Sequence, residues 1–335
     1  MATSYPDRTN ARGIWRITDI TKNLLEDGTW PGVYGSRGVW AAGLTPSDID
    51  VIDFINIQST GDSTDFGDLT SARTRQPGAM ASHTRGTFVG GVETPTRINK
   101  IDYITIATAG NSADFGDASS VTQNSGGAAE NSTRGIYCLG DVSDSASNVI
   151  EYITFATLGN GTDFGNKTVT VKSGGATSSP TRMVMAGGYG GSPAGYLNVI
   201  DFIEMSTLGN AVDFGDLTRS HSNIMGLGSQ TRAVFGAGQD GSANSNVMDT
   251  VTIASHGDAI DFGDLTVARE DTGGGCENTI RGVFGAGATP SLTNTMDYVT
   301  IATSGNAVDF GDQTVTANFR CSLSNGAAGL GSLDR

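Results

Sequence analysis

The tetrapeptide Asp-Phe-Gly-Asp, or a close variant of it, occurs six times in this chain at nearly constant spacing. The copies begin at Asp65, Asp114, Asp163, Asp213, Asp261 and Asp309, which are 49, 49, 50, 48 and 48 residues apart. Self-similarity at a fixed period of this length is the signature of a repeat architecture. The chain is therefore expected to fold as six versions of one unit, and each other residue either recurs with the repeat or departs from it.

An Asp-Phe-Gly tripeptide binds the magnesium of ATP in protein kinases, so phosphoryl transfer is the first chemistry to consider. That chemistry also needs a glycine-rich phosphate loop with a lysine, and a catalytic His-Arg-Asp with a downstream asparagine. The sequence contains neither. One chain is not expected to carry six active sites of one kind, so we interpret the tripeptide as a structural part of the repeat.

Each repeat contains segments with the composition of β-strands. An arginine followed by apolar residues opens one segment, as in Arg281-Gly282-Val283-Phe284, and a β-branched and aromatic segment follows, as in Met296-Asp297-Tyr298-Val299-Thr300-Ile301. A Gly-Asn or Gly-Asp turn then leads into the Asp-Phe-Gly-Asp strand. A glycine-rich stretch supplies a fourth short strand. Four short strands in 48 to 50 residues is the size of one propeller blade.

The sequence therefore predicts an all-β fold, a six-bladed β-propeller over residues 37–335 with a short N-terminal arm over residues 1–36 that contains one helix. The expected blade units lie near residues 37–70, 71–119, 120–168, 169–218, 219–266 and 267–314. No glycine-rich strand precedes the first arginine strand, whereas residues 317–332 follow the last unit unmatched. We expect this segment to complete blade one and so to close the ring.

The repeat resembles the kelch family. Small or glycine pairs end one strand, as at Gly90-Gly91 and Gly187-Gly188, and two aromatic columns follow. The first column is Phe54, Tyr103, Tyr152, Phe202 and Tyr298, and the second is Phe66, Phe115, Phe164, Phe214, Phe262 and Phe310. Thr250 interrupts the first column, and Phe stands where kelch repeats usually carry Trp. The resemblance covers residues 37–332 and implies a kelch-like propeller without implying kelch functions.

Three phrases are similar to repeat proteins of tailed bacteriophages, particularly marine cyanophage-type tail-fibre and related virion proteins: RGVFGAG, MDYVTIATSGNAVDFGD and ARGIWRITDITKNLLEDGTWP. This resemblance implies a non-enzymatic structural protein of the virion, of the tail-fibre or surface-decoration type. Such a protein contacts other virion proteins, and a host-surface glycan or protein, from several symmetric copies. The alternative is a secreted carbohydrate-binding propeller, either a lectin or a glycan-active enzyme.

Composition restricts the partners. The net charge is −15, with no visible basic patch, so nucleic acid would be repelled. Cys138, Cys276 and Cys321 occupy different repeat positions and are expected to be small buried residues. The first ten residues lack the apolar core of a signal peptide, and no 18-residue apolar run occurs. We therefore expect a protein made in the host cytoplasm, without membrane insertion, and located in the virion.

Two charged columns recur at matching strand positions, and we predict that they form structural ion pairs within each blade, for which the planar guanidinium is well suited. The alternative is an anion-binding ring of arginines around the channel. The arginines are Arg37, Arg85, Arg134, Arg182, Arg232 and Arg281, and the acids are Asp53, Asp102, Glu151, Asp201, Asp249 and Asp297.

Metal and catalytic sites are not indicated. The Asp-Phe-Gly-Asp segments lack the alternating acids of a calcium loop, and Asn166 replaces the second Asp in the third copy. His83, His221 and His256 lie at different repeat positions, without Cys or acids at zinc-ligand spacing. A Ser-His-Asp arrangement has no nucleophile-elbow sequence to support it. We predict no metal, no cofactor and no enzymatic activity.

Recognition is expected where the copies differ, because loops carry binding while repeated strands carry packing. The loop from Gly187 to Tyr196 diverges most. Its Tyr189 and Tyr196 are the predicted contact with a ligand or the host, either stacking on a sugar or anchoring a protein. The alternative is that they only cover the blade edge.

The N-terminal arm is the predicted docking segment. Ile17, Ile20 and Leu24 fall on one face of a predicted helix, which Trp15 and Trp30 flank in the sequence. We predict that these five residues attach the arm to a neighbouring virion protein. The alternative is that the arm packs across the bottom of the propeller.

Overall fold

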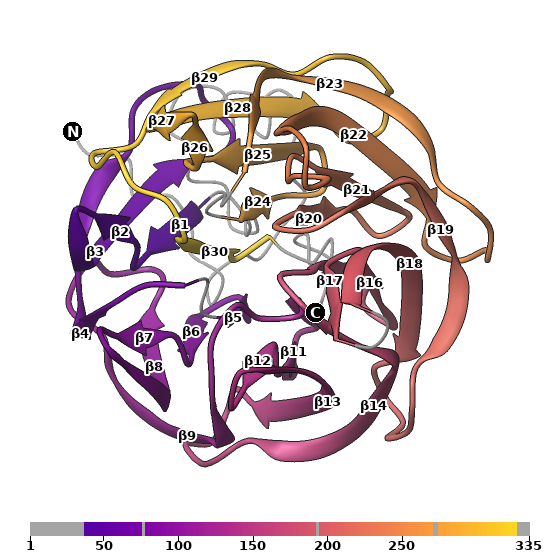
Figure 1. Cartoon of the computed structure of the whole chain (residues 1–335). Coiled ribbons are helices and arrows are strands. Elements are labelled where there is room, and N and C mark those ends of the chain that lie inside the picture. Colours follow the sequence, from indigo (N-terminus) through magenta and orange to yellow (C-terminus); the bar gives the residue numbers. More distant parts are fainter. Residues whose placement is uncertain (1–36, 76–77, 192–193, 271–273, 327–335) are drawn as a thin grey trace, which may run out of the picture.

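The computed structural model describes residues 37–75, 78–191, 194–270 and 274–326, which form an all-β fold without a helix. Figure 1 shows the strands arranged in chain order as a propeller-like ring around a central space. The prediction of an all-β, propeller-like fold is therefore confirmed. The predicted helix and its residues Trp15, Ile17, Ile20, Leu24 and Trp30 lie outside the described residues.

The same antiparallel four-strand unit recurs along the described residues, and we number the units one to six in chain order. The innermost strands are β30 (Cys321–Ser324), β5 (Gly78–Ala81), β10 (Ala128–Glu130), β15 (Gly175–Ser178), β20 (Met225–Gly228) and β24 (Gly275–Glu277). The second strands are β1 (Arg37–Ala41), β6 (Arg85–Val89), β11 (Arg134–Cys138), β16 (Arg182–Ala186), β21 (Arg232–Gly236) and β25 (Arg281–Gly285). Each innermost strand pairs with the second strand of its unit.

The second strand pairs in turn with the third, and the third with the outermost strand, which carries Asp-Phe-Gly. The third strands are β3 (Ser47–Asn56), β8 (Thr96–Thr105), β13 (Ser145–Thr154), β18 (Ala194–Glu204), β22 (Ser245–Thr252) and β28 (Thr295–Thr300). The outermost strands are β4 (Thr64–Arg73), β9 (Ala113–Thr122), β14 (Thr162–Lys172), β19 (Val212–His221), β23 (Ile260–Arg269) and β29 (Val308–Asp312).

Short strands decorate the loops between the second and third strands. They are β2 (Leu44–Thr45), β7 (Val92–Glu93), β12 (Asp141–Val142), β17 (Tyr189–Gly191), β26 (Ala288–Thr289) and β27 (Ser291–Leu292). Strand β17 pairs with both β14 and β18, so units three and four merge into one sheet of ten strands. The most divergent loop of the sequence therefore links two neighbouring units.

The two ends of the described chain meet in unit one. Strand β30, from the C-terminal side, pairs antiparallel with β1, with Val39 opposite Leu323. The innermost strands also contact one another in sequence, from β5 through β10, β15, β20 and β24 to β30 and back to β5. The predicted completion of the first unit by the C-terminal segment is therefore confirmed, with the strand itself limited to Cys321–Ser324.

The hydrophobic core is divided among the boundaries between consecutive units. Val39 and Ile52 of unit one pack in one cluster with Phe88 and Ile104 of unit two. Equivalent clusters lie at the other boundaries, including one that joins unit six to unit one. Each sheet thus buries both of its faces, which accounts for the mixed alternation of apolar residues along the third strands.

The Asp-Phe-Gly segment forms a β-bulge that the next unit contacts through its main chain. In unit four, Ile200 lies opposite Gly215 and Asp201 opposite Asp213, which leaves Phe214 as the extra residue. The Phe214 carbonyl oxygen accepts a hydrogen bond from the Gly257 amide of unit five, with an N–O distance of 2.9 Å. We call this bond, from a turn glycine to the Phe carbonyl of the preceding unit, the inter-unit clasp. It recurs at all six boundaries, at 2.7–3.0 Å.

The glycine of Asp-Phe-Gly is required by this close approach. Its φ lies between 141° and 152° in the six copies, a region that side chains disfavour. A Cβ atom there would lie 2.2–2.6 Å from the carbonyl group of the facing turn glycine. The tripeptide thus combines a core phenylalanine with a backbone that only glycine permits.

Replacing a bulge glycine should therefore destabilise the ring. In Gly263→Ala the new Cβ would lie 2.5 Å from Gly305, at a φ of 141°, and we expect a loss of about 2 kcal/mol or more. Gly305→Ala alters the other partner of the same contact, where a Cβ meets nothing within 4 Å, and should be nearly neutral. Thermal and urea unfolding measure both variants, and equal losses would contradict the assignment.

Candidate functional site

Each arginine of the repeated column donates to the main chain of the next unit rather than to the column acid of its own unit. Its Nη1 donates to a backbone carbonyl just beyond the third strand of that unit, at 2.5–3.2 Å. For Arg37, Arg85, Arg134, Arg182, Arg232 and Arg281 the acceptors are Ile106, Phe155, Met205, Ile253, Ile301 and Ile57. Because the last arginine reaches back to unit one, these bonds run once around the ring.

Five of the six guanidinium groups also lie over the first aromatic column. The distance from the guanidinium carbon to the ring centroid is 4.3–4.7 Å. Each of these rings meets the Asp-Phe-Gly phenylalanine of its own unit edge to face, with centroids 5.9–6.2 Å apart. Arginine, first aromatic and second aromatic therefore form one packed column in each of these units.

The predicted ion pairs within each unit are wrong. Arg37 lies opposite Asn56, whereas Asp53 lies opposite Trp40. Three residue pairs at about 3.3 Å each separate the two charges by roughly 10 Å along the strands. Arg182 does form an ion pair, but with its direct cross-strand neighbour Glu204, at 2.6 Å. The alternative of an arginine ring around the channel also fails, because none of the six column arginines is among the described residues that line it.

The six column acids are buried and bind the preceding unit. Each carboxylate accepts a hydrogen bond from the Thr or Ser that follows the Asp-Phe-Gly segment of that unit, and in five pairs the amide of the same residue also donates. The pairs are Thr314 with Asp53, Thr70 with Asp102, Ser119 with Glu151, Thr168 with Asp201, Thr218 with Asp249, and Thr266 with Asp297. The acids therefore link units as the arginines do.

Three of these acids also pair with fully buried arginines that the sequence analysis missed. The ion pairs are Arg320 with Asp53 at 2.7 Å, Arg73 with Asp102 at 3.0 Å, and Arg269 with Asp297 at 2.6 Å. Arg73 and Arg269 stand at the same repeat position, at the end of an outermost strand, so their spacing from Asp-Phe-Gly could have drawn attention to them. Arg320 follows the last unit and has no such signal.

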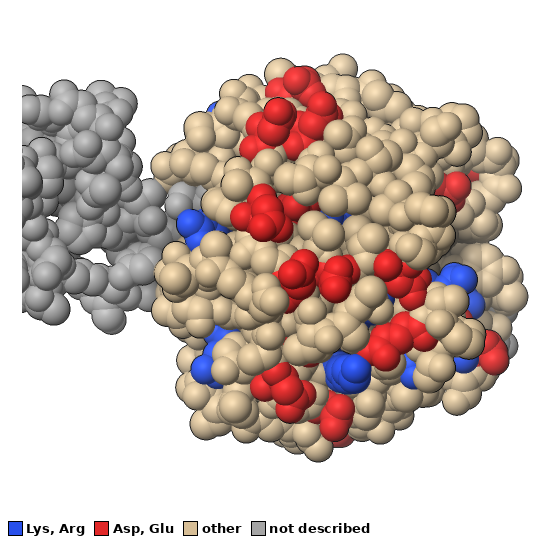
Figure 2. Space-filling model, turned by 90° about the vertical axis from the view of Figure 1, so that its left-hand side faces the viewer, with Lys and Arg blue, Asp and Glu red and all other residues tan. Residues whose placement is uncertain are grey.

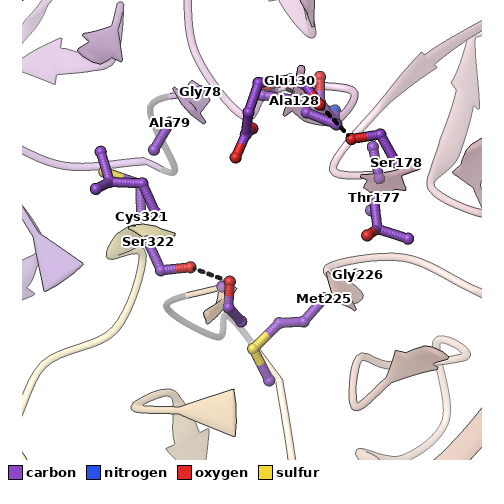
Figure 3. Close-up of a pocket in the computed structure, with 18 of the residues that line it drawn as sticks. Gly78, Ala79, Ala128, Glu130, Thr177, Ser178, Met225, Gly226, Cys321 and Ser322 are labelled. Atoms are coloured by element: carbon purple, nitrogen blue, oxygen red, sulfur yellow. Dashed lines mark hydrogen bonds between the residues drawn. The ribbon is translucent and has the colours of Figure 1, made fainter. Parts of the chain in front are cut away.

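The central channel is lined by the innermost strands of all six units and holds a cavity of about 100 Å³. Figure 3 shows Gly78, Ala79, Ala128, Glu130, Thr177, Ser178, Met225, Gly226, Cys321 and Ser322 around its open centre. Most of these side chains are small, because the innermost strands converge there. The channel is a candidate site to which all six units contribute residues.

Two acids of the channel wall, Glu130 and Glu277, stand out chemically. They occupy the same position of their strands, opposite Gly135 and Gly282, and are 4% and 6% exposed. Burial raises the pKa of Glu130 well above its ordinary value, the charge of Glu277 adds to this, and the Ala81 amide offsets part of it. The sequence signal was an acid four residues before the column arginine, present in only two of the six copies.

Three serines of the channel wall are already engaged in hydrogen bonds. Ser178, Ser322 and Ser324 each donate to a backbone carbonyl of the preceding unit, at 2.6–2.8 Å. A nucleophilic serine instead needs its hydroxyl held against a base. The channel geometry therefore gives no support to hydrolysis by these serines.

The three cysteines are free and buried, as predicted. Burial raises the pKa of Cys138 to about 11 and that of Cys321 to about 12, and it raises the pKa of Cys276 as well. The thiolate is the reactive form of cysteine. These thiols stay protonated at neutral pH and serve as small core residues.

The tyrosine pair of the divergent loop lies at the opposite end of the second strands from the column arginines. Tyr189 and Tyr196 are cross-strand neighbours on β17 and β18, half-buried, with ring centroids 5.3 Å apart and edge-to-face packing. The Tyr196 hydroxyl lies 3.4 Å from Gln239 Oε1. Burial, with Tyr189 beside it, raises the pKa of Tyr196. The pair presents a neutral aromatic surface of the kind that sugars and proteins bind.

The histidines lie apart from one another. His221 is buried on β19, which lowers its pKa. His256 is exposed on unit five and packs on Phe202 of unit four, with centroids 4.6 Å apart. Nowhere in the described ranges do three or more His, Cys, Asp or Glu side chains gather closely enough to hold a metal ion.

Comparison with models of known protein families finds no match for this chain. Comparison with curated proteins finds no similar sequence either. In the part of the chain that the structure describes, no helix has the length and apolar character needed to cross a membrane. The functional assignment therefore depends on the geometry and on the resemblance described above.

The channel acids predict an unusual pH dependence of stability. Because the folded-state pKa of Glu130 is raised, its contribution to stability is complete below the ordinary glutamate pKa and is lost as pH rises through the folded value. Glu130→Gln should raise the free energy of unfolding at pH 8 by about 1 kcal/mol or more, since each pKa unit corresponds to about 1.4 kcal/mol. At pH 4 it should have little effect.

Urea unfolding across this pH range measures the difference between Glu130→Gln and the parent protein. Asp65→Asn, at an exposed acid of the ring's outer wall, is the control and should follow the parent curve. A Glu130→Gln variant that is less stable at pH 8 than the parent would show that the carboxylate form is needed.

Proposed function

We propose that this chain is a six-bladed, kelch-like propeller that serves as a non-enzymatic structural protein of a tailed-bacteriophage particle, of the tail-fibre or surface-decoration type. Each four-strand unit is one blade. The disc displays its variable loops to the host surface or to other virion proteins. Residues 1–36 attach it to the particle, where several symmetric copies assemble.

The cyclic order of the contacts supports the six-bladed assignment. The clasp, the arginine bonds and the bonds from Thr or Ser to the column acids each occur at six successive boundaries and return from unit six to unit one. A closed ring of this kind leaves no unpaired sheet edge at the junction of the chain ends. It gives a rigid platform, which suits display on a particle exposed to mechanical and chemical stress.

One observation carries the non-enzymatic part of the proposal. The column arginine and the column acid, which occupy the same position in all six copies, are used in contacts between units. Such residues are not available for a bound substrate. What remains variable between copies is the set of loops, and binding is expected there.

The surface charge agrees with an exposed position on a particle. Figure 2 shows Asp and Glu gathered in clusters on the side of the ring, with fewer Lys and Arg among them. The first Asp of all six Asp-Phe-Gly segments is exposed. A net charge of −15 favours solubility and discourages binding to nucleic acid.

The competing function is a secreted carbohydrate-binding propeller. The paired rings of Tyr189 and Tyr196 favour it, because adjacent aromatic rings stack on sugars. The two functions differ in where the protein is found: a virion component copurifies with particles in fixed stoichiometry, whereas a secreted lectin does not.

Particle composition tests the proposal directly. Particles purified by density gradient from infected cells should contain this protein in a constant ratio to the major capsid protein, measured by quantitative mass spectrometry. Antibody labelling should place it on the outer surface in electron micrographs. Its recovery only in the particle-free supernatant would overturn the virion assignment.

The tyrosine pair provides a separate test of the recognition loop. Tyr189→Ala with Tyr196→Ala should weaken binding of the purified protein to host cells, or to its glycan on an array, at least tenfold, which is about 1.4 kcal/mol. Leu208→Ser is the matched control, because Leu208 is 56% exposed at the other end of the strands. Unchanged binding by the double variant would exclude this loop as the contact.

A further inference from the structure

Unit five departs from the packed column of the other units. Thr250 stands where the other units carry Phe or Tyr, and its hydroxyl donates to the Ala233 carbonyl at 2.7 Å. No ring of the described residues lies over the Arg232 guanidinium, although Arg232 still donates to Ile301 of unit six. The guanidinium and Phe262 of this unit are therefore without the aromatic ring that lies between their counterparts elsewhere.

A cavity of about 170 Å³ opens at this place. It is lined by Arg232, Thr250, Thr252, His256, Asp258 and Ile260, together with the main chain of the turn between the third and outermost strands. Arg232 is half-buried, and His256 and Ile260 are exposed at the rim. We call this cavity the unit-five slot.

We propose that the unit-five slot binds an aromatic side chain, a phenyl or phenol ring, supplied by a protein partner. The chain itself shows what fits: in five units a Phe or Tyr ring lies 4.3–4.7 Å from the same guanidinium. A partner's ring in the slot would complete the sixth column. It would stack on Arg232 through a cation–π contact.

The surroundings of the slot favour a protein as the source of the ring. Ile260 at its rim is 67% exposed, and Val212 of unit four and Val308 of unit six, at the same repeat position, are 54% and 53% exposed. Units one to three carry Thr64, Ala113 and Thr162 there. An aromatic anchor in a pocket bordered by apolar residues is the usual centre of a protein interface.

The slot is separate from the loop assigned to host contact. It lies at the end of the third strand, beside the start of the second strand, whereas Tyr189 follows the end of the second strand. The proposal therefore does not depend on the virion assignment. The two can fail independently.

Nuclear magnetic resonance can test the slot with p-cresol, which reproduces the tyrosine side chain. We expect p-cresol to shift the Arg232 Nε–H and Ile260 methyl resonances saturably. Cyclohexanol, similar in size but not aromatic, should bind about two- to fivefold more weakly, the loss expected for an exposed cation–π contact. The peptide acetyl-Gly-Tyr-Gly-amide should bind at least as tightly as p-cresol.

Thr250→Tyr is the decisive variant, because it gives unit five the aromatic ring that the other five units carry at this position. We expect it to fold, with an unchanged or higher melting temperature, and to abolish the saturable shifts. Thr250→Val keeps the slot open and should still bind p-cresol. Thr250→Leu tests occlusion again should the tyrosine variant fail to fold.

Arg232→Gln tests the guanidinium through the Ile260 methyl signal. It should remove the preference for p-cresol over cyclohexanol while leaving weak binding. Equal binding of the two probes to the parent protein, or saturable shifts that persist in folded Thr250→Tyr, would overturn the proposal. Binding of p-cresol without binding of the peptide would overturn the inference that a protein supplies the ring.

Discussion

The ring depends on a main-chain hydrogen bond between neighbouring units. A side chain in place of the Asp-Phe-Gly glycine would obstruct this bond. The bulge turns the Phe carbonyl outward, and the facing turn glycine donates to it from the next unit. The neighbouring backbone can come this close only because the residue after the phenylalanine is glycine and has no Cβ. The clasp therefore explains why Asp-Phe-Gly is copied at every boundary. The tripeptide whose Asp binds a metal in a kinase has a different role here: the phenylalanine fills the core and the glycine allows the next unit to approach.

The fully buried ion pairs lie near the place where the two ends of the described chain meet. Burying a carboxylate costs free energy unless it is paired or hydrogen-bonded. Each of the six column acids accepts a hydrogen bond from a Thr or Ser hydroxyl of the preceding unit. Arginines are added only at three consecutive boundaries, five to six, six to one, and one to two. At the other three boundaries, Ser or Thr is the donor from the preceding unit to the column acid. The fully buried ion pairs thus gather beside the junction of β1 and β30, where chain connectivity does not hold the first unit together.

Much of the fold could be predicted because the repeat period fixes the size of a unit and the unmatched C-terminal segment fixes the closure. The partners of the column arginines and column acids could not be predicted from the sequence. Arg37 and Asp53 stand at matching positions of adjacent strands, but strand register sets them three residue pairs apart. Both then bond across a boundary, to another unit. Glu130 and Glu277 were missed for a different reason: they occur in two copies only, so a comparison that looks for recurrence passes over them.

The departures from the repeat are distributed in a way that packing alone does not require. Glu130 and Glu277 line the central channel, the tyrosine pair lies at one end of the second strands, and Thr250 lies near the other end. At each of these places the chain departs from the repeat, and what results is a buried carboxyl group, an aromatic surface or an open slot. A buried charge and an open slot each lower stability relative to the repeated solution. The other units show the more stable alternative: five carry an aromatic ring where unit five has Thr250, and four carry a small residue where Glu130 and Glu277 stand. Packing alone therefore does not account for these departures.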